Sequence, residues 1–278
     1  MPELPEVEHV VRALRAVVGR TIAASDVRLP KLIAPLSVTA FKRKIKGCSI
    51  RNVSRRGKFI LIELQKPDRK GGGILAVHLR MTGKFLYLTA DDELPKHSHA
   101  IFYLDNDRRL VFRDQRQFGV MKLISTAELS QTKGIRELAP EPFGDEFNFD
   151  YFRSVLQRSR RSLKTLLLDQ TKVLGLGNIY AAEALFRARI NPFKPASELS
   201  LRRAERLYEA VREVMQFAID NIRGPVQLEK EFSYGAAFER FWQVYERERE
   251  PCFVCATKIR RLTHGGRSTY WCPKCQRR

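Results

Sequence analysis

The sequence predicts an α+β protein in which an N-terminal helix and a β-sandwich precede a helical region and a small cysteine-held hairpin. Short β-branched and aromatic runs follow one another from about Cys48 to Ser125, and apolar residues at helical spacing dominate from about 149 to 222. Four of the five cysteines stand in the last 27 residues. The expected domains are 1–132 (the β-sandwich), 133–250 (helices and a connector) and 251–278 (the cysteine-rich tail).

The first expected element is a helix over residues 6–18, whose apolar side chains have the spacing of one buried face. Pro5 stands where a first helical turn tolerates proline, and Gly19 stands where helices end. The apolar residues are Val7, Val10, Val11, Leu14, Val17 and Val18.

Strands come next, as short apolar runs separated by Gly, Pro, Asp and Asn. Such a series is typical of a β-sandwich or a barrel, and we expect the sandwich. The runs are 59–64, 74–79, 85–88, 100–104, 110–112 and 120–124.

A loop around 126–148, which contains Pro140, Pro142 and Gly144, indicates a domain boundary. The helices expected after it are 149–158, 163–169, 178–189 and 198–222, and 223–250 forms an irregular or partly helical connector. A glycine-rich turn, Gly175 to Gly177, opens the third helix, where backbone N–H groups suit an anion such as a DNA phosphate. Glycine turns between helices are common, so this motif alone is a weak signal.

The cysteines of the tail form a C-x2-C-x16-C-x2-C pattern: Cys252, Cys255, Cys272 and Cys275. In a reducing cytosol this spacing predicts one structural zinc ion with four thiolate ligands and no open position for chemistry. Between the pairs, Gly265 and Gly266 have the character of a tight hairpin tip. Seven basic residues and no acid surround them, which favours a reader of DNA backbone over a merely solubilising tail.

The charge balance indicates a polyanionic partner. Lys and Arg number 51 against 31 acids, a formal net charge of +20, which points to DNA or RNA before an anionic membrane surface. There is no apolar run long enough to span a membrane, and the acidic start of the chain lacks the basic segment of a signal peptide. We expect a cytoplasmic, nucleoid-associated monomer.

The candidate chemistry stands at the start of the chain. Removal of Met1 before a small residue exposes the secondary amine of Pro2, and a free amine can attack a sugar carbon to form a Schiff base. An α-amino group titrates near about 7.7 to 8.0, so much of it is neutral at cellular pH. Glu3 follows at once, as a carboxyl suited to proton transfer. On residue types alone, however, an ordinary chain terminus is the simpler interpretation of Pro2.

A resemblance changes that interpretation. The start Pro2-Glu3-Leu4-Pro5-Glu6-Val7-Glu8 resembles the N-terminal signature of the formamidopyrimidine-DNA glycosylase family, and further motifs resemble that family in order along essentially the whole chain. These are Arg55–Phe59, His78–Gly83, Asp114–Gly119, Gly175–Ala181 and the four-cysteine tail. The resemblance implies a β-sandwich, a helix–two-turn–helix domain and a zinc-finger hairpin.

The resemblance also implies residue roles. Pro2 would be the nucleophile and Glu3 the acid–base, Lys58 would be the strand lysine beside the active site, and Arg267 the finger-tip arginine that contacts phosphate. Glu6 would support the site, although a carboxylate in the first helical turn is equally explained by the helix dipole. The implied reaction removes oxidised purines from double-stranded DNA and then nicks the abasic site by β- and δ-elimination.

Other matched positions would contact DNA. Met81 would fill the gap left by an extruded base, Arg116 would face the orphaned base, and Phe118 would wedge the stack. His97, Arg160 and Asn178 also fall at DNA-contacting positions, although the stretch around Arg160 aligns in more than one register.

Two positions depart from the family pattern. Gln117 replaces a second arginine, which removes a phosphate contact and weakens binding modestly. Glu246 stands where a glycine is usual, so the turn entering the finger is expected to differ.

Three functions are compatible with these features. The oxidised-purine glycosylase and lyase is favoured by the start of the chain and by Met81, Arg116 and Phe118. A related endonuclease VIII type would prefer oxidised pyrimidines. A non-catalytic DNA-binding protein would use the same basic finger, but Pro2, Glu3 and Lys58 argue against it. The loop that covers the lesion is expected within 223–240.

Overall fold

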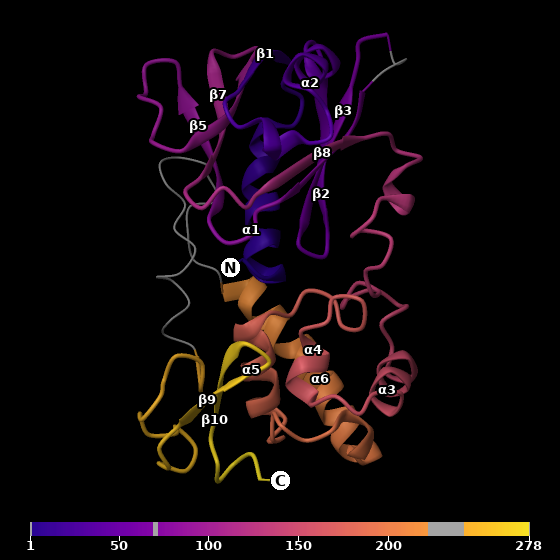
Figure 1. The fold of residues 1–278 in the computed structure, drawn as a ribbon, viewed down its shortest axis with the longest axis vertical. Coiled ribbons are helices and arrows are strands. Elements are labelled where there is room, and N and C mark those ends of the chain that lie inside the picture. The colour runs from indigo at the N-terminus through magenta and orange to yellow at the C-terminus, as the bar shows by residue number, and fades with distance from the viewer. Residues whose placement is uncertain (1, 69–71, 222–241, 278) are drawn as a thin grey trace. The chain divides into compact units, whose positions relative to one another are not determined.

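The computed structural model describes residues 2–68, 72–221 and 242–277 (Figure 1). The chain divides into two compact units. Of the described residues, Pro2 and those within Glu6–Arg136 belong to the first, and Glu3–Pro5, 137–221 and 242–277 to the second. The expected lesion-covering loop, 223–240, lies outside the described residues.

The first unit is a β-sandwich of two four-stranded antiparallel sheets, as the sequence predicted. One sheet has the order β1 (Ile22–Val27), β6 (Ser98–Leu104), β7 (Arg108–Asp114) and β5 (Gly83–Thr89). The other has the order β2 (Ser49–Arg56), β3 (Phe59–Gln65), β4 (Gly72–His78) and β8 (Val120–Ile124).

Helix α1 (Leu4–Leu14) contributes to the core between these sheets. Val10 of the helix, Val77 of one sheet and Phe112 of the other belong to one cluster of buried side chains. A 3-10 turn (Arg15–Val17) extends α1, and Gly19 follows with φ of 86°, the left-handed region that suits a glycine at a helix end. The helix predicted at 6–18 is therefore confirmed with its last turn tightened. The short helix α2 (Val38–Ile45) was not predicted.

The second unit contains α3 (Phe149–Gln157), α4 (Leu163–Leu167), α5 (Asn178–Arg187), α6 (Leu201–Asn221) and a hairpin of β9 (Arg260–His264) and β10 (Arg267–Trp271) (Figure 1). Side chains of Asn148 and Ser162 accept hydrogen bonds from backbone N–H groups and so cap α3 and α4. The four predicted helices are confirmed, with ends that differ by up to three residues.

The hairpin tip is a two-residue turn in which both residues have positive φ, 57° at Gly265 and 71° at Gly266. Glycine adopts this conformation without a steric penalty, which confirms the predicted tip. In the described part of the chain, no helix is long and apolar enough to cross a membrane.

Candidate active site and nucleic-acid interface

The carboxylate of Glu3 caps helix α5. It accepts hydrogen bonds from the backbone N–H groups of Gly177, Ile179 (2.9 Å) and Tyr180 (3.3 Å), and only 2% of the residue is exposed. The N-cap residue of α5 is a glycine, which has no side chain to cap the helix itself. A carboxylate from the start of the chain thus takes the place of a local cap, and the positive end of the helix dipole stabilises its charge.

Space for that carboxylate depends on Gly177. A Cβ at this position would lie 2.4 Å from both Cδ and Oε1 of Glu3, closer than any real contact. Its φ of −128° is open to all residues, so the requirement for glycine comes from Glu3 and not from the backbone.

This arrangement corrects one expectation. The glycine-rich turn was a weak signal for a DNA phosphate at the N–H groups that open α5, but three of these groups are bound to Glu3. The anion that this helix start accommodates is a carboxylate of the chain itself.

Lys164 is a cation that the sequence analysis missed. It is fully buried, and its Nζ donates to the backbone oxygen of Ser268 (2.6 Å) and to Oγ1 of Thr269 (2.8 Å). Burial, and then the charge of Arg267, lowers the pKa of Lys164 to about 8, against an opposing effect of Glu3. The only sequence signal was one lysine within the apolar run 163–168.

The hairpin that carries Arg267 is fixed to the helices by further polar contacts. Asn178 donates through Nδ2 to the same Ser268 oxygen (3.0 Å), and the ring of His264 lies 2.7 Å from Oγ of Ser162. His264 also packs edge-on against Phe193. Glu3, Lys164, Asn178 and Arg267 are therefore held in the second unit around the start of α5, with two cations beside one carboxylate.

The remaining predicted catalytic residues lie in the first unit. Pro2 is buried just before α1, and Glu6 is buried in the first turn of that helix. Lys58 is buried too, but it occupies the two-residue turn between β2 and β3 and not a strand, because Arg56 pairs directly with Phe59. Gly57, with φ of 55°, makes that turn possible.

Two side chains, Glu8 and His78, fix the residues on either side of the turn that contains Lys58. Glu8 on α1 binds Arg55 at the end of β2 (2.8 Å), which fixes the hairpin to the helix. His78 packs edge-on against Phe59, and its Nδ1 accepts from the N–H of Arg80 (3.0 Å). Burial, with the charges of Arg80 and Lys58, lowers the pKa of His78 to about 3, so this imidazole is neutral in the folded protein at physiological pH.

The predicted intercalating residues project from two loops of the same unit. Met81 and Phe118 are 41% and 52% exposed, unusual for large apolar side chains, and the guanidinium of Arg116 lies 4.9 Å from the centre of the Phe118 ring. Residues beside them, Arg80 and Gln117, have positive φ of 56° and 57°. Strained backbone of this kind in non-glycine residues persists where the surroundings enforce it, often at functional sites.

Asp114 joins these loops and was not recognised as a site residue from the sequence. Its buried carboxylate accepts from the hydroxyl of Thr82 and from the N–H of Gly119 (2.7 Å), and Thr82 in turn accepts from the N–H of Arg116 (3.0 Å). The loops of Met81 and Phe118 are thus positioned together by one carboxylate.

The other predicted DNA contacts are exposed. His97 has a positive φ of 68° between strands β5 and β6, and Arg160 lies between α3 and α4. Among the described residues, no hydrogen bond or ion pair joins Arg160 to the group around Lys164.

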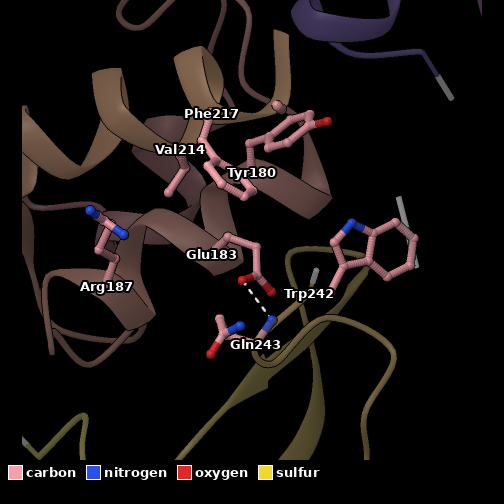
Figure 2. Close-up of a pocket in the computed structure, with 8 residues that line it drawn as sticks. Tyr180, Glu183, Arg187, Val214, Phe217, Trp242 and Gln243 are labelled. Carbon is pink, nitrogen blue, oxygen red and sulfur yellow. Dashed lines mark hydrogen bonds between the residues drawn. The ribbon is translucent and has the colours of Figure 1, made fainter. Parts of the chain in front are cut away.

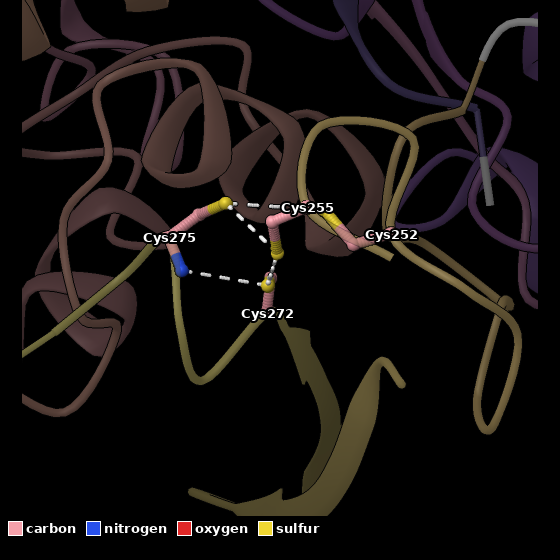
Figure 3. A group of neighbouring side chains, drawn as sticks. All are labelled: Cys252, Cys255, Cys272 and Cys275. Atoms are coloured by element: carbon pink, nitrogen blue, oxygen red, sulfur yellow. Dashed lines mark hydrogen bonds between the residues drawn. The ribbon is translucent and has the colours of Figure 1, made fainter. Parts of the chain in front are cut away.

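The four tail cysteines form a compact cluster (Figure 3). Their Sγ atoms all lie within 4.8 Å of one another, with separations of 3.9 Å (Cys252 to Cys275), 3.4 Å (Cys255 to Cys272) and 3.5 Å (Cys255 to Cys275). Four ligands about 2.3 Å from a tetrahedral ion would be about 3.8 Å apart, and disulfides would be near 2.05 Å. The cluster therefore fits a metal ion and not disulfides.

A second buried carboxylate attaches the cysteine-rich tail to α5. Glu183 accepts from the N–H groups of Gln243, Val244 and Tyr245, at 2.9, 3.0 and 2.9 Å. Figure 2 shows the bond to Gln243. Burial raises the pKa of Glu183 although these three bonds oppose the shift. A cavity of about 200 Å³ lies beside Glu183, and none of the residues predicted for catalysis lines it. Figure 2 shows the residues that do.

Glu246 follows this attachment with φ of 57°. The sequence predicted that replacing the usual glycine changes the turn. The residue adopts the left-handed conformation that a glycine favours, which strains its backbone, and the change in the turn stays a prediction.

Family models match almost the whole chain. Residues 1–121 match the formamidopyrimidine-DNA glycosylase N-terminal domain, residues 138–229 the formamidopyrimidine-DNA glycosylase H2TH domain, and residues 249–278 a zinc finger found in FPG and IleRS. The chain belongs to the formamidopyrimidine-DNA glycosylase family. The formamidopyrimidine-DNA glycosylase of Pelotomaculum thermopropionicum is 45% identical over 280 residues, which cover 100% of this chain and 99% of that protein.

Solved structures of this family are similar over the full length. One is a complex of wild-type Lactococcus lactis FPG (MutM) with DNA containing an oxidised pyrimidine, with a TM-score of 0.89, 33% identity and full coverage of both chains. Another is the Lactococcus lactis enzyme with DNA containing FAPY-dG, with a TM-score of 0.89, 32% identity and coverage of 99% of this chain and 100% of that one. This member of the family is therefore an enzyme that acts on damaged DNA in base-excision repair.

Proposed function

We propose that this enzyme excises oxidised purines, 8-oxoguanine and formamidopyrimidines, from double-stranded DNA through the amine of Pro2, and then nicks the abasic site. The observation that carries the proposal is the carboxylate of Glu3, covalently next to the nucleophile and held by three N–H groups of α5. A buried carboxylate fixed in this way is suited to exchange protons with a substrate at one defined place.

In the first step, the neutral amine of Pro2, freed by removal of Met1, attacks C1′ of the damaged nucleotide. The bond from C1′ to the base breaks, and the base departs with the proton lost by the amine. The bond from C1′ to the ring oxygen O4′ then breaks, O4′ takes a proton, and the nitrogen of Pro2 becomes an iminium with C1′. Glu3 exchanges the proton on the sugar in this step.

In the second step, the iminium makes the hydrogen on C2′ acidic, and its removal expels the 3′ phosphate by β-elimination. A further proton loss expels the 5′ phosphate by δ-elimination, and hydrolysis of the iminium returns Pro2. Lys58 serves in proton transfer, and Arg267 with Lys164 neutralises phosphate charge, while Glu6 supports the site. Lys164 is fully buried, so it acts through its charge and by holding the hairpin of Arg267 at Ser268 and Thr269.

In the bound duplex, Met81 and Phe118 fill the space of the flipped nucleotide, and Arg116 reads the orphaned base. The guanidinium donors of Arg116 match the acceptor edge of cytosine and match adenine poorly. Excision should therefore be faster opposite cytosine. His97, Arg160 and Asn178 are proposed to contact the DNA backbone.

We infer that the metal of the four-cysteine cluster is one structural Zn²⁺ per chain. Cys252, Cys255, Cys272 and Cys275 would hold it, and four thiolates leave no position for substrate. The ion would cross-link the tail and so keep the hairpin of Arg267 in shape.

Oxidised pyrimidines are a second candidate substrate class, because a structure similar to this chain was solved with DNA that contains one. Matched duplexes carrying 8-oxoguanine, formamidopyrimidine or thymine glycol, each opposite cytosine or adenine, separate the two. Faster action on thymine glycol would favour the pyrimidine preference, and equal rates opposite both bases would remove Arg116 from base reading.

The nucleophile is tested by trapping. Borohydride reduces an iminium to a stable amine, so enzyme incubated with 8-oxoguanine duplex should give a cross-linked species that peptide mapping places on residue 2. Pro2→Gly keeps an α-amino group without the ring and should lose excision while it retains lesion binding. An adduct on Lys58 would overturn the assignment to Pro2.

A further inference from the structure

Four arginines that the proposed chemistry does not use lie close together in the second unit, at the start of α6 and just after α5. Arg202, Arg203 and Arg206 stand in the first two turns of α6, spaced so that Arg206 shares a face with each of the other two. Arg189, just after α5, adds a fourth guanidinium to this group, which we call the arginine cluster.

The cluster is electrostatically unfavourable without a ligand. The start of a helix carries positive partial charge and favours acids, yet the first turn of α6 contains none. Burial and the charges of Arg203, Arg189 and Arg202 lower the pKa of Arg206, as expected where like charges crowd together.

Some arginines of the same unit are paired with acids. Arg187 pairs with Glu213 and Arg161 pairs with Asp169. In the described residues, by contrast, no ion pair neutralises any member of the cluster. A local arrangement that opposes the helix dipole and repels itself indicates that an anion completes it.

The cluster lies far from the start of α5. Arg187 at the end of α5 pairs with Glu213, whereas Tyr180 near its start shares a cavity with Ala218, so α5 and α6 run antiparallel. At 1.5 Å per residue, Arg206 lies about 18 Å along α6 from the level of Ala218, beyond the end of α5. The residues around Glu3 and the cluster are thus at opposite ends of this helix pair.

We propose that the arginine cluster binds the phosphate backbone of a second DNA duplex, separate from the duplex that carries the lesion. The enzyme already works on a polymer of phosphates, and the planar guanidinium matches a phosphate with two parallel hydrogen bonds. Among the exposed large apolar side chains of the described residues, Leu201 alone falls within the first two turns of α6. A protein partner would need a larger apolar centre, so the surface fits DNA better than an acidic protein.

The test fills the lesion site first. Enzyme is saturated with a short duplex containing a stable abasic-site analogue, and a fluorescent undamaged duplex is then titrated at about 50 and about 200 mM salt. Binding of this second duplex, seen as a two-duplex complex, is expected for the wild type. It needs no step at Pro2, so it can fail or succeed independently of the proposed reaction.

The variant is Arg202→Gln with Arg203→Gln and Arg206→Gln, because glutamine keeps helix propensity and removes charge. It should bind the second duplex at least about tenfold more weakly. The slope of log K for this duplex against the logarithm of salt concentration should become less steep by about 2.7, that is 0.9 for each lost phosphate contact. Excision on a short lesion duplex should be unchanged. The control, Arg43→Gln with Lys44→Gln and Lys46→Gln, removes the same charge from α2 and the residue after it.

Several results would overturn the proposal. One is a wild-type enzyme that binds no second duplex once the lesion site is filled. Another is an equal loss of second-duplex binding in the control, which would reduce the effect to net charge. Slower excision by the cluster variant on the short duplex would assign the arginines to the lesion-bearing DNA. Tighter binding of polyglutamate than of DNA would indicate an acidic protein partner.

Discussion

Gly177→Ala tests whether the cap made by Glu3 is required for catalysis. The added methyl would lie 2.4 Å from Cδ and Oε1 of Glu3, so the carboxylate must leave the start of α5. The backbone itself is not strained by alanine, because φ is −128°. Only the position of one carboxylate is changed.

The loss of stability follows from the hydrogen bonds to Glu3 that the substitution breaks. Glu3 accepts three N–H groups, and a bond to a charged group contributes about 1.5 to 3 kcal/mol. Loss of one or two of them should lower the free energy of unfolding by about 2 to 5 kcal/mol, since little water reaches a residue that is 2% exposed. A displaced proton donor should also slow excision by about 10² to 10⁴.

The assay is single-turnover excision of 8-oxoguanine together with denaturant unfolding. Gly144→Ala is the matched control, because a Cβ there would lie 3.5 Å from the oxygen of Glu141, an ordinary contact. Excision by Gly177→Ala within about threefold of the control would refute the reasoning that Glu3 must sit on α5 to act.

Other perturbations test separate parts of the structure. In the unfolded chain His78 takes up a proton below about pH 6.5, whereas in the folded protein its pKa is about 3 and it stays neutral. The free energy of unfolding should therefore fall by about 1 to 2 kcal/mol between pH 6.5 and pH 5. Unfolding titrations of His78→Gln should show much less of this fall. Glu246→Gly should raise the free energy of unfolding by up to about 1 kcal/mol, because glycine adopts φ of 57° without strain. Cys272→Ser should release zinc, measured by a colorimetric chelator, and abolish DNA binding and excision while most far-UV circular dichroism remains.

Each of these has a result that contradicts it. Parallel pH curves for His78→Gln and wild type would show that burial of this imidazole does not affect stability. A lower stability of Glu246→Gly would mean that the glutamate side chain contributes more than its backbone costs. Full activity of metal-free Cys272→Ser would show that the finger is dispensable.

Much of the fold was predictable because its elements have strong local patterns. In strand β3, Phe59–Leu64 is an apolar run interrupted only by Glu63, and the pair Gly265-Gly266 is typical of a hairpin tip. By contrast, β1 was missed because Ile22 and Val27, its buried ends, enclose four small or polar residues. Helix α2 was missed because only Phe41 and Ile45 of its side chains are fully buried, within a basic segment.

The site residues also include some that the sequence predicts and some that it does not. Pro2, Glu3 and the cysteines belong to recognisable motifs. Lys164 and Asp114 do not, because their importance comes from partners such as Thr269 and Thr82, which no spacing in the sequence brings to them. The glycines of the α5 turn were noticed, but which anion they accommodate depended on a residue 174 positions away.

The 174 positions between Glu3 and Gly177 affect when, during synthesis, the carboxylate can reach its helix. Glu3 is synthesised before Gly177, Ile179 and Tyr180, which are separated from it by 174 to 177 positions. At about 5 to 20 residues per second, the carboxylate waits roughly 10 to 35 seconds for its helix. On the proposed mechanism, a nascent or truncated chain with a complete β-sandwich would carry Pro2 without the carboxylate of Glu3 held on α5. Interrupted synthesis should then yield inert fragments and not unregulated DNA-cutting ones.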